Sequence, residues 1–146
     1  MHDQDYILFQ DMTVKFLEAE VVPDYLAWEE AGIMPRSVWN TMGENGLLGV
    51  DVPEAYGGAE APLEICQMII SEMAQMCLGG LATAYNIHAN IVIPYILNIG
   101  TEEQKKYWLP KLCTGENVGA LAMSEPAAGS DLAGIKTRAI KDGDNW

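Results

Sequence analysis

Apolar residues recur at helical spacing along most of the chain, and prolines and glycines divide this pattern into segments. Three helices are predicted in the first third, over residues 4–21, 24–31 and 35–46. The apolar stripe of the first consists of Ile7, Val14, Leu17 and Val21. Residues 47–53 follow as a short extended piece, and a loop rich in glycine and proline comes after them.

The middle of the chain carries the longest apolar periodicity. A helix over residues 63–79 is apolar around most of its circumference, so we expect it to be buried between other elements. The next helix covers residues 81–100, and Pro94 is expected to kink it. Its predicted inner face consists of Leu81, Tyr85, His88, Val92, Tyr95 and Ile99. A last helix, 101–115, opens with capping-box spacing and should be bent or shortened by Pro110.

The pattern changes from helical to extended near the end of the chain. Residues 118–123 are short and apolar, residues 135–139 alternate, and the Asp-Gly pair at 142–143 predicts a hairpin turn. We therefore predict a mainly α fold with a helical bundle domain over residues 1–117. Residues 118–146 are interpreted as the beginning of an incomplete β domain, because one strand pair is not a stable unit.

Composition and charge restrict the function classes. The chain has 146 residues, of which 49% are hydrophobic and 20% charged, as in an ordinary globular domain. A net charge of −13 repels nucleic acid and anionic lipid, but backbone amides can still hold a phosphate-bearing ligand. No apolar run is long enough for a membrane span. The acidic N-terminus lacks the basic region of a signal peptide, so a cytoplasmic location is expected.

Cysteine and histidine positions favour structural roles. An odd, sparse set of cysteines argues against a disulfide framework. Cys66 and Cys77 would lie about 16 Å apart in one helix, too far for a disulfide bond. We expect these two residues and Cys113 to be buried, reduced thiols. The two histidines, His2 and His88, are too distant in sequence to indicate a metal site.

The stretch AMSEPAAGSDLAG, residues 122–134, combines short polar side chains with little bulk. It is predicted to be a strand followed by a turn. Ser124 supplies a hydroxyl, and Gly129 lets a ligand approach the backbone closely. Ser130 and Asp131 follow beside exposed amides. Such a strand and turn could cradle a flat heteroaromatic ring and its phosphates, although similar sequences are also found in loops without ligands.

This stretch resembles the first signature of the acyl-CoA dehydrogenases, with about ten constrained positions in the same order. Similar segments of that family match GLLGVDVPEAYGG, GTEEQKKYWLPKL and GIKTRAIKDGDNW. Two further stretches, EVVPDYLAWEEAGIMPRSVW and NIHANIVIPYI, resemble its long-chain-type members. Ala127 departs from the pattern, because glycine is common at that position.

The resemblance implies a flavoenzyme of fatty acid metabolism with FAD as cofactor and a helical, a β and a second helical domain. It implies α,β-dehydrogenation of an acyl-CoA to the trans-2-enoyl-CoA, electron transfer to an electron-transfer flavoprotein, and a homotetramer. It places Leu121, Met123 and Ser124 against the flavin ring, and Gly129 and Ser130 near the pyrophosphate. Ser130 also matches a position that contacts the acyl-CoA.

Glu125 and Asp131 match motif positions, and we assign them the structural role of anchoring the turn through hydrogen bonds to backbone amides. The resemblance places the catalytic base in the C-terminal portion of the family, so no catalytic residue is assigned in this chain. His88 is expected to be half-buried with its hydrogen bonds satisfied. The alternative that the resemblance suggests is contact of Tyr85, His88 and Val92 with the substrate.

Two alternatives to an acyl-CoA dehydrogenase remain at this stage. A chain that ends at residue 146 could be a catalytically silent binding or assembly module with the same helical fold. The other alternative is a related flavoenzyme, either an acyl-CoA oxidase or a relative that acts on another substrate. In every case these 146 residues alone are expected to be inactive, because they supply only one wall of the flavin pocket.

Overall fold

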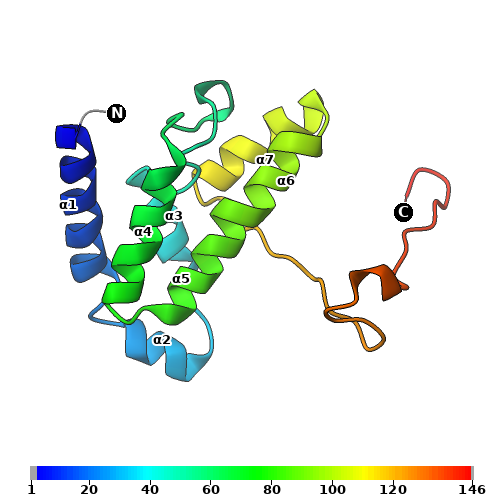
Figure 1. Cartoon of the computed structure of the whole chain (residues 1–146), viewed down its shortest axis with the longest axis horizontal. Coiled ribbons are helices and arrows are strands. Elements are labelled where there is room, and N and C mark those ends of the chain that lie inside the picture. The colour runs from blue at the N-terminus through cyan, green and yellow to red at the C-terminus, as the bar shows by residue number, and fades with distance from the viewer. Residues whose placement is uncertain (1–2, 146) are drawn as a thin grey trace.

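A helical body and a C-terminal arm make up the computed structural model, which describes residues 3–145 (Figure 1). The α-helices are α1 (Asp3–Glu20), α2 (Tyr25–Ala31), α3 (Arg36–Glu44), α4 (Leu63–Gln75), α5 (Gly79–Asn86), α6 (Ile93–Ile99) and α7 (Glu102–Cys113). A π-helical segment, Ile87–Val92, joins α5 to α6, and short 3-10 turns lie at Glu54–Tyr56 and Leu132–Gly134. The predicted mainly α fold is confirmed.

The core of the body lies where α1 packs on α4, α4 on α5, and α6 on α7. In α3, the apolar residues Val38, Trp39 and Met42 are buried. In α4, only six of its 13 residues are buried and six are exposed, so the helix is covered on one face and the expected burial around its circumference is wrong. The largest fully buried side chains include Leu17, Met42, Ile65, Ile69, Met73, Leu81, Tyr85, Ile93 and Leu109. Their removal from water is the main favourable contribution to the folding of the body. No helix within residues 3–145 is long and apolar enough to cross a membrane.

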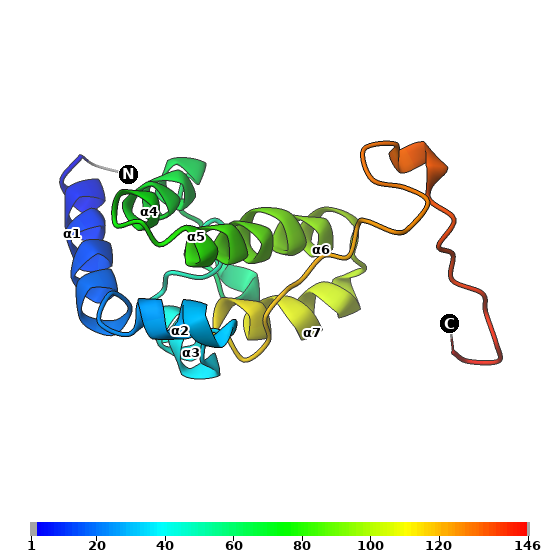
Figure 2. The same cartoon turned by 90° about the horizontal axis from the view of Figure 1, so that it is seen from below.

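The π-helical segment changes which residues face the core. Helices α5 and α6 form one continuous rod through it (Figure 2). A π turn takes more residues than an α turn, so positions after it are rotated relative to the predicted stripe. Tyr95 and Ile99 are therefore 57% and 77% exposed, and Ile93 is buried instead. The predicted inner face is correct before the π segment and wrong after it.

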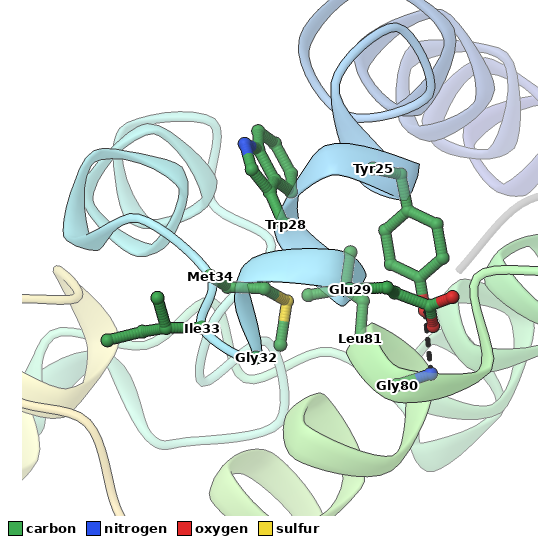
Figure 3. Close-up of a pocket in the computed structure, with 8 residues that line it drawn as sticks. All are labelled: Tyr25, Trp28, Glu29, Gly32, Ile33, Met34, Gly80 and Leu81. Carbon is green, nitrogen blue, oxygen red and sulfur yellow. Dashed lines mark hydrogen bonds between the residues drawn. The ribbon is translucent and has the colours of Figure 1, made fainter.

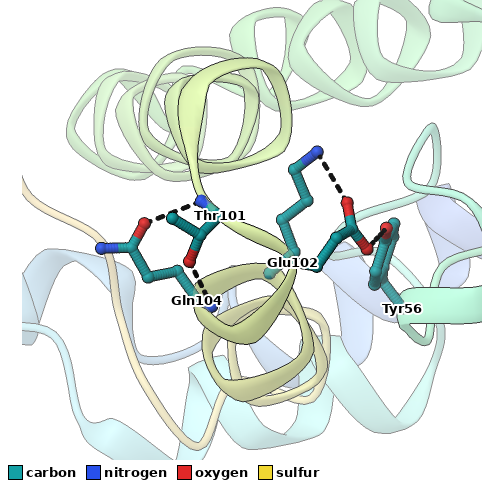
Figure 4. Close-up of polar contacts among 5 residues, drawn as sticks. Tyr56, Thr101, Glu102 and Gln104 are labelled. Atoms are coloured by element: carbon teal, nitrogen blue, oxygen red, sulfur yellow. Dashed lines mark hydrogen bonds and ion pairs between the residues drawn. The ribbon is translucent and has the colours of Figure 1, made fainter.

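The cap of α7 follows the prediction, whereas its proline does not end the helix. The Thr101 hydroxyl accepts a hydrogen bond from the Gln104 amide at 3.2 Å, and the Gln104 side chain accepts one from the Thr101 amide at 2.8 Å (Figure 4). The Tyr56 hydroxyl donates to Glu102 at 2.8 Å and ties the loop after residue 53 to this helix. Helix α7 continues past Pro110 to Cys113, so the proline does not end it, and the alternative of a bend stays a prediction.

Three local predictions are wrong for identifiable reasons. Residues 47–53 form turns and bends instead of an extended piece, because Gly49 has a φ of +63° and the Val52 amide bonds back to the Gly49 carbonyl oxygen. Ile7 is exposed, since α1 turns Thr13, Phe16 and Leu17 inward. Cys77 is exposed and lies beyond the end of α4, with a φ of 60°.

The arm, residues 118–145, extends away from the body in both views (Figures 1 and 2). Its backbone is extended over residues 118–124 and 135–141, and neither segment pairs with another strand among the described residues. The predicted turn at 142–143 is confirmed, because Asp142 and Asn145 exchange backbone hydrogen bonds at 2.9 and 3.0 Å.

Candidate functional site

Residues 114–119 join the end of α7 to the arm and include its first two residues, and this segment, called the base of the arm, is held tightly against the body. Gly115 has a φ of +74°, and a Cβ there would lie 2.2 Å from the Trp39 carbonyl oxygen, so only glycine fits. The Arg36 guanidinium donates hydrogen bonds to the carbonyl oxygens of Gly115 and Glu116. The arm therefore leaves the body from a fixed point.

His88, in the π-helical segment, joins two parts of this base. Its side chain is 0% exposed. The Nδ1 atom accepts a hydrogen bond from the Gly119 amide at 2.9 Å, and Nε2 lies 3.1 Å from the Leu112 carbonyl oxygen. Because an amide can only donate, Nδ1 carries no proton, and the neutral imidazole donates from Nε2. Burial lowers the pKa of His88, which agrees with the neutral form.

The structural interpretation of His88 is confirmed, with complete rather than partial burial. Tyr85, one turn earlier, is also fully buried, and its hydroxyl donates to the Leu47 carbonyl oxygen at 2.9 Å. Both side chains are thus committed to contacts inside the body. The structure offers no support for the alternative in which they touch a substrate.

The extended segment beyond the base carries three of the predicted cofactor contacts. Leu121 and Met123 are 40% and 50% exposed, and Ser124 is exposed as well. The backbone amides and carbonyls of residues 120–124 have no hydrogen-bond partner within residues 3–145. Apolar side chains beside open backbone groups suit a flat ring with a polar rim, so these residues fit the flavin that the resemblance implies.

Glu125 holds the turn that follows. Its carboxylate accepts hydrogen bonds from the Lys136 amide at 2.6 Å, from the Thr137 amide at 2.9 Å, and from the Thr137 hydroxyl. The Thr137 hydroxyl, followed by the Lys136 amide, lowers the pKa of Glu125. A carboxylate held in its charged form by three donors is a poor proton acceptor. The predicted anchoring role of Glu125 is confirmed.

Gly129 and Ser130 lie on the far side of the same turn from Ser124. Glu125 and Ala128 exchange backbone hydrogen bonds at 3.0 Å and close the turn between them. A Cβ on Gly129 would meet nothing within 4 Å, and both Gly129 and Ser130 are exposed. The turn thus leaves open space for a ligand to approach the Gly129 backbone. All five predicted cofactor contacts lie within one short stretch of the arm, outside the packed body.

The two buried thiols of the body are held in their protonated form. All three cysteines are free, and Cys66 and Cys113 are buried as predicted. Burial, followed by the nearby Asp51 carboxylate, raises the pKa of Cys66 to about 12 and that of Cys113 to about 11. Within residues 3–145, no group of three His, Cys, Asp or Glu side chains is arranged to hold a metal ion.

A separate apolar pocket lies between α2 and the start of α5 (Figure 3). It has a volume of about 180 Å³, and Trp28, Met34 and Leu81 contribute to its lining. Its polar groups are bonded to one another, since the Tyr25 hydroxyl accepts from the Gly80 amide and donates to Glu29. The Tyr25 hydroxyl and the Gly80 amide are therefore engaged with each other rather than open to a ligand.

The contacts at the base of the arm were missed by the sequence analysis. Arg36, Gly115 and Gly119 belong to no recognised motif, and each acts on a residue distant in sequence. Gly115 was predicted to close the last helix, and it does lie just past the end of α7, with a positive φ. Gly115 also lies with its backbone against α3. The sequence of a single chain contains no pattern that indicates this contact.

Comparisons with known proteins agree on one family. The family model for the acyl-CoA dehydrogenase N-terminal domain matches residues 3–116. The mitochondrial long-chain specific acyl-CoA dehydrogenase of Sus scrofa is 40% identical over 143 residues, which cover 97% of this chain and 33% of that protein. This chain therefore spans about a third of the length of the curated relatives it matches.

Solved structures show the same likeness. An acyl-CoA dehydrogenase from Geobacillus kaustophilus matches with a TM-score of 0.91 and 47% identity, over 99% of this chain and 37% of that one. A glutaryl-CoA dehydrogenase from Mycobacterium smegmatis, solved in complex with FADH2, matches with a TM-score of 0.88 and 28% identity. That match covers 97% of this chain and 36% of the other.

Proposed function

The chain belongs to the acyl-CoA dehydrogenase family, and from this premise we propose that it is part of a flavin-dependent enzyme that converts an acyl-CoA thioester to its trans-2-enoyl-CoA. The observation that carries the proposal is the exposed stretch of the arm, residues 121–130. It combines open backbone groups, apolar side chains and hydroxyls, and it lies on a turn that Glu125 anchors.

The proposed cofactor is FAD, held on this side by the arm. Leu121 and Met123 would pack against the flavin ring, and the Ser124 hydroxyl would donate to one of its polar atoms. The Gly129 and Ser130 backbone would approach the pyrophosphate, which needs no lysine or arginine because amides can bind phosphate oxygens. Ser130 is also the proposed contact to the acyl-CoA.

The proposed reaction removes a proton from Cα and a hydride from Cβ of the acyl chain. The thioester carbonyl makes the Cα proton acidic once hydrogen bonds polarise it, and a carboxylate outside this chain takes that proton. A bound flavin supplies the acceptor for the hydride. The contribution of this chain is to fix the orientation of the ring and to exclude water from one side of it.

Further parts of the proposal concern the whole protein. We propose a long-chain acyl-CoA as substrate, since the mitochondrial enzyme of Sus scrofa is a long-chain specific one. An electron-transfer flavoprotein as electron acceptor, a homotetrameric assembly and a cytoplasmic location complete the proposal.

The test uses the full-length protein, meaning this chain together with the regions that its relatives carry in addition. Anaerobic addition of acyl-CoAs of increasing chain length should bleach the flavin absorbance, most completely with the preferred length. Slow reoxidation by oxygen and fast reoxidation by an electron-transfer flavoprotein would support a dehydrogenase. Fast reoxidation by oxygen would instead indicate an oxidase, and a full-length protein without flavin would contradict the proposal.

A further inference from the structure

We propose that His88 is a positioning residue for the cofactor-binding arm, and that its hydrogen bond to the Gly119 amide sets where residues 120–124 leave the body. The inference rests on the proposed function, because it assigns a purpose to a contact at the base of the flavin-binding segment. His88 itself touches no proposed ligand, and it acts through Gly119.

The bond to Gly119 lies directly before the proposed flavin contacts along the chain. Gly119 is the last residue before Ser124 whose amide is bonded to the body, since residues 120–124 have no backbone partner within the described chain. Leu121, the first proposed flavin contact, comes two positions later. A shift of Gly119 would therefore be passed directly to the segment that binds the ring.

At the same place, the backbone of Gly119 packs closely against the π-helical segment. A Cβ on Gly119 would lie 2.7 Å from Cγ1 of Val92, so the arm passes directly over the π-helical segment. The Trp39 ring packs beside the imidazole, with centroids 5.4 Å apart, and limits its rotation. His88 is thus held from α3, from its own segment and from the Leu112 carbonyl oxygen, and it presents Nδ1 in one direction.

Only the neutral imidazole of His88 can accept the hydrogen bond from the Gly119 amide. A protonated ring has no acceptor at Nδ1 for the Gly119 amide. Burial is the main cause of the lowered pKa of His88, the hydrogen bond to the Leu112 carbonyl oxygen partly opposes it, and the positive charge of Arg36, which holds the same base from α3, adds to it. No carboxylate acts on His88 among the described residues. Its surroundings therefore preserve the acceptor at neutral pH.

Two near-isosteric variants of the full-length flavin-loaded protein separate positioning from stability. In His88→Asn, the side-chain oxygen reaches the place of Nδ1 and still accepts from Gly119. In His88→Gln, the amide nitrogen reaches the place of Nε2 and donates to Leu112, but nothing accepts from Gly119. Each variant keeps one bond and loses the other, so the losses in stability should be similar.

We expect the dissociation constant for FAD to rise about tenfold in His88→Gln and to stay within about twofold in His88→Asn. Hydrogen exchange of the peptide 116–124, followed by mass spectrometry in the protein stripped of flavin, should accelerate in His88→Gln only. Equal changes in the two variants, in proportion to lost stability, would overturn the inference.

The exchange measurement also separates this inference from the proposed function. If the full-length protein binds no FAD, the flavin proposal fails. Selective acceleration of the 116–124 peptide in His88→Gln would then still show that His88 positions the arm, and unchanged exchange would show that it does not.

Discussion

The body and the arm differ in how far their apolar side chains are buried and their polar groups hydrogen-bonded within the chain. The body has a packed apolar core in which even the buried His88 and Tyr85 find partners, although apolar side chains such as Tyr95 and Ile99 are exposed on its surface. In the arm, Leu121 and Met123 remain exposed, and the neighbouring backbone groups have no partners among the described residues. The difference teaches that the body is organised by its own contacts, whereas the sequence of the arm suits a ligand or a surface outside residues 3–145.

Glycines provide the largest expected contrast between the two regions. Gly115→Ala places a Cβ 2.2 Å from the Trp39 carbonyl oxygen at a φ of +74°, so either the arm or α3 must move. We expect the free energy of unfolding to fall by about 3 kcal/mol or more. The measurement is urea unfolding of the chain, followed by circular dichroism.

The matched control for that variant is Gly129→Ala in the arm. A Cβ on Gly129 meets nothing within 4 Å, so the unfolding free energy should change by less than about 0.5 kcal/mol. If both glycine variants lower stability alike, the arm is part of the same packed unit as the body, and the comparison fails.

Leucines test the same contrast through packing. Leu81 is fully buried, and Leu81→Ala should lower the unfolding free energy by about 3 kcal/mol through lost burial and a new cavity. Leu121→Ala should lower it by less than about 0.5 kcal/mol. In the full-length protein, FAD affinity measured by fluorescence titration should show a specific loss in Leu121→Ala. Loss of affinity only in proportion to stability would remove Leu121 from the site.

Ser124→Ala should affect the cofactor without affecting the fold. The hydroxyl is exposed and makes no hydrogen bond within residues 3–145, so the melting temperature of the chain should not change. In the full-length protein, loss of one hydrogen bond to the flavin should weaken binding by about three- to tenfold or slow flavin reduction. Flavin retention and stopped-flow reduction at the wild-type level would contradict this assignment.

The ease of prediction from sequence also differs between body and arm. Some helix ends were predictable from a local rule, as with the Thr101 capping box at the start of α7 and the end of α2 before Gly32. The end of α4 was not, since that helix ends at Gln75 and not at Gly79. The inner face of the rod was predictable only up to His88, because an α-helical period does not anticipate a π turn.

The anchoring of the arm was predictable in type but not in detail. Glu125 was expected to bond backbone amides, and it does, but the sequence did not indicate that its partners are Lys136 and Thr137. The bonds of Arg36 and His88 to the base of the arm join residues far apart in sequence. Contacts of that kind depend on the packed body, and no local pattern encodes them.

The smallest expected effect is a pH dependence of the unfolding free energy, caused by His88 in the body, which holds Gly119 at the start of the arm. Burial lowers the pKa of His88 below its unfolded value of about 6.5, so the unfolded chain binds the extra proton first as the pH falls. The stability that the neutral imidazole contributes is complete above that value and is lost as the pH falls from there through the folded pKa.

We therefore compare the unfolding free energy of the wild-type chain with that of His88→Asn between pH 7.5 and 5. The wild type should lose more stability than the variant over this range, by a fraction of the roughly 2 kcal/mol that an unfolded pKa of about 6.5 allows at pH 5, because asparagine does not titrate. Glu125, whose pKa is lowered, keeps its carboxylate charged throughout, so the anchor of the turn should not contribute to the difference. Parallel pH profiles for the two proteins would mean that His88 binds its proton equally well in the folded and the unfolded chain, so that its neutral form adds nothing to stability. The base of the arm would then be held by Arg36 and the fit of Gly115 alone.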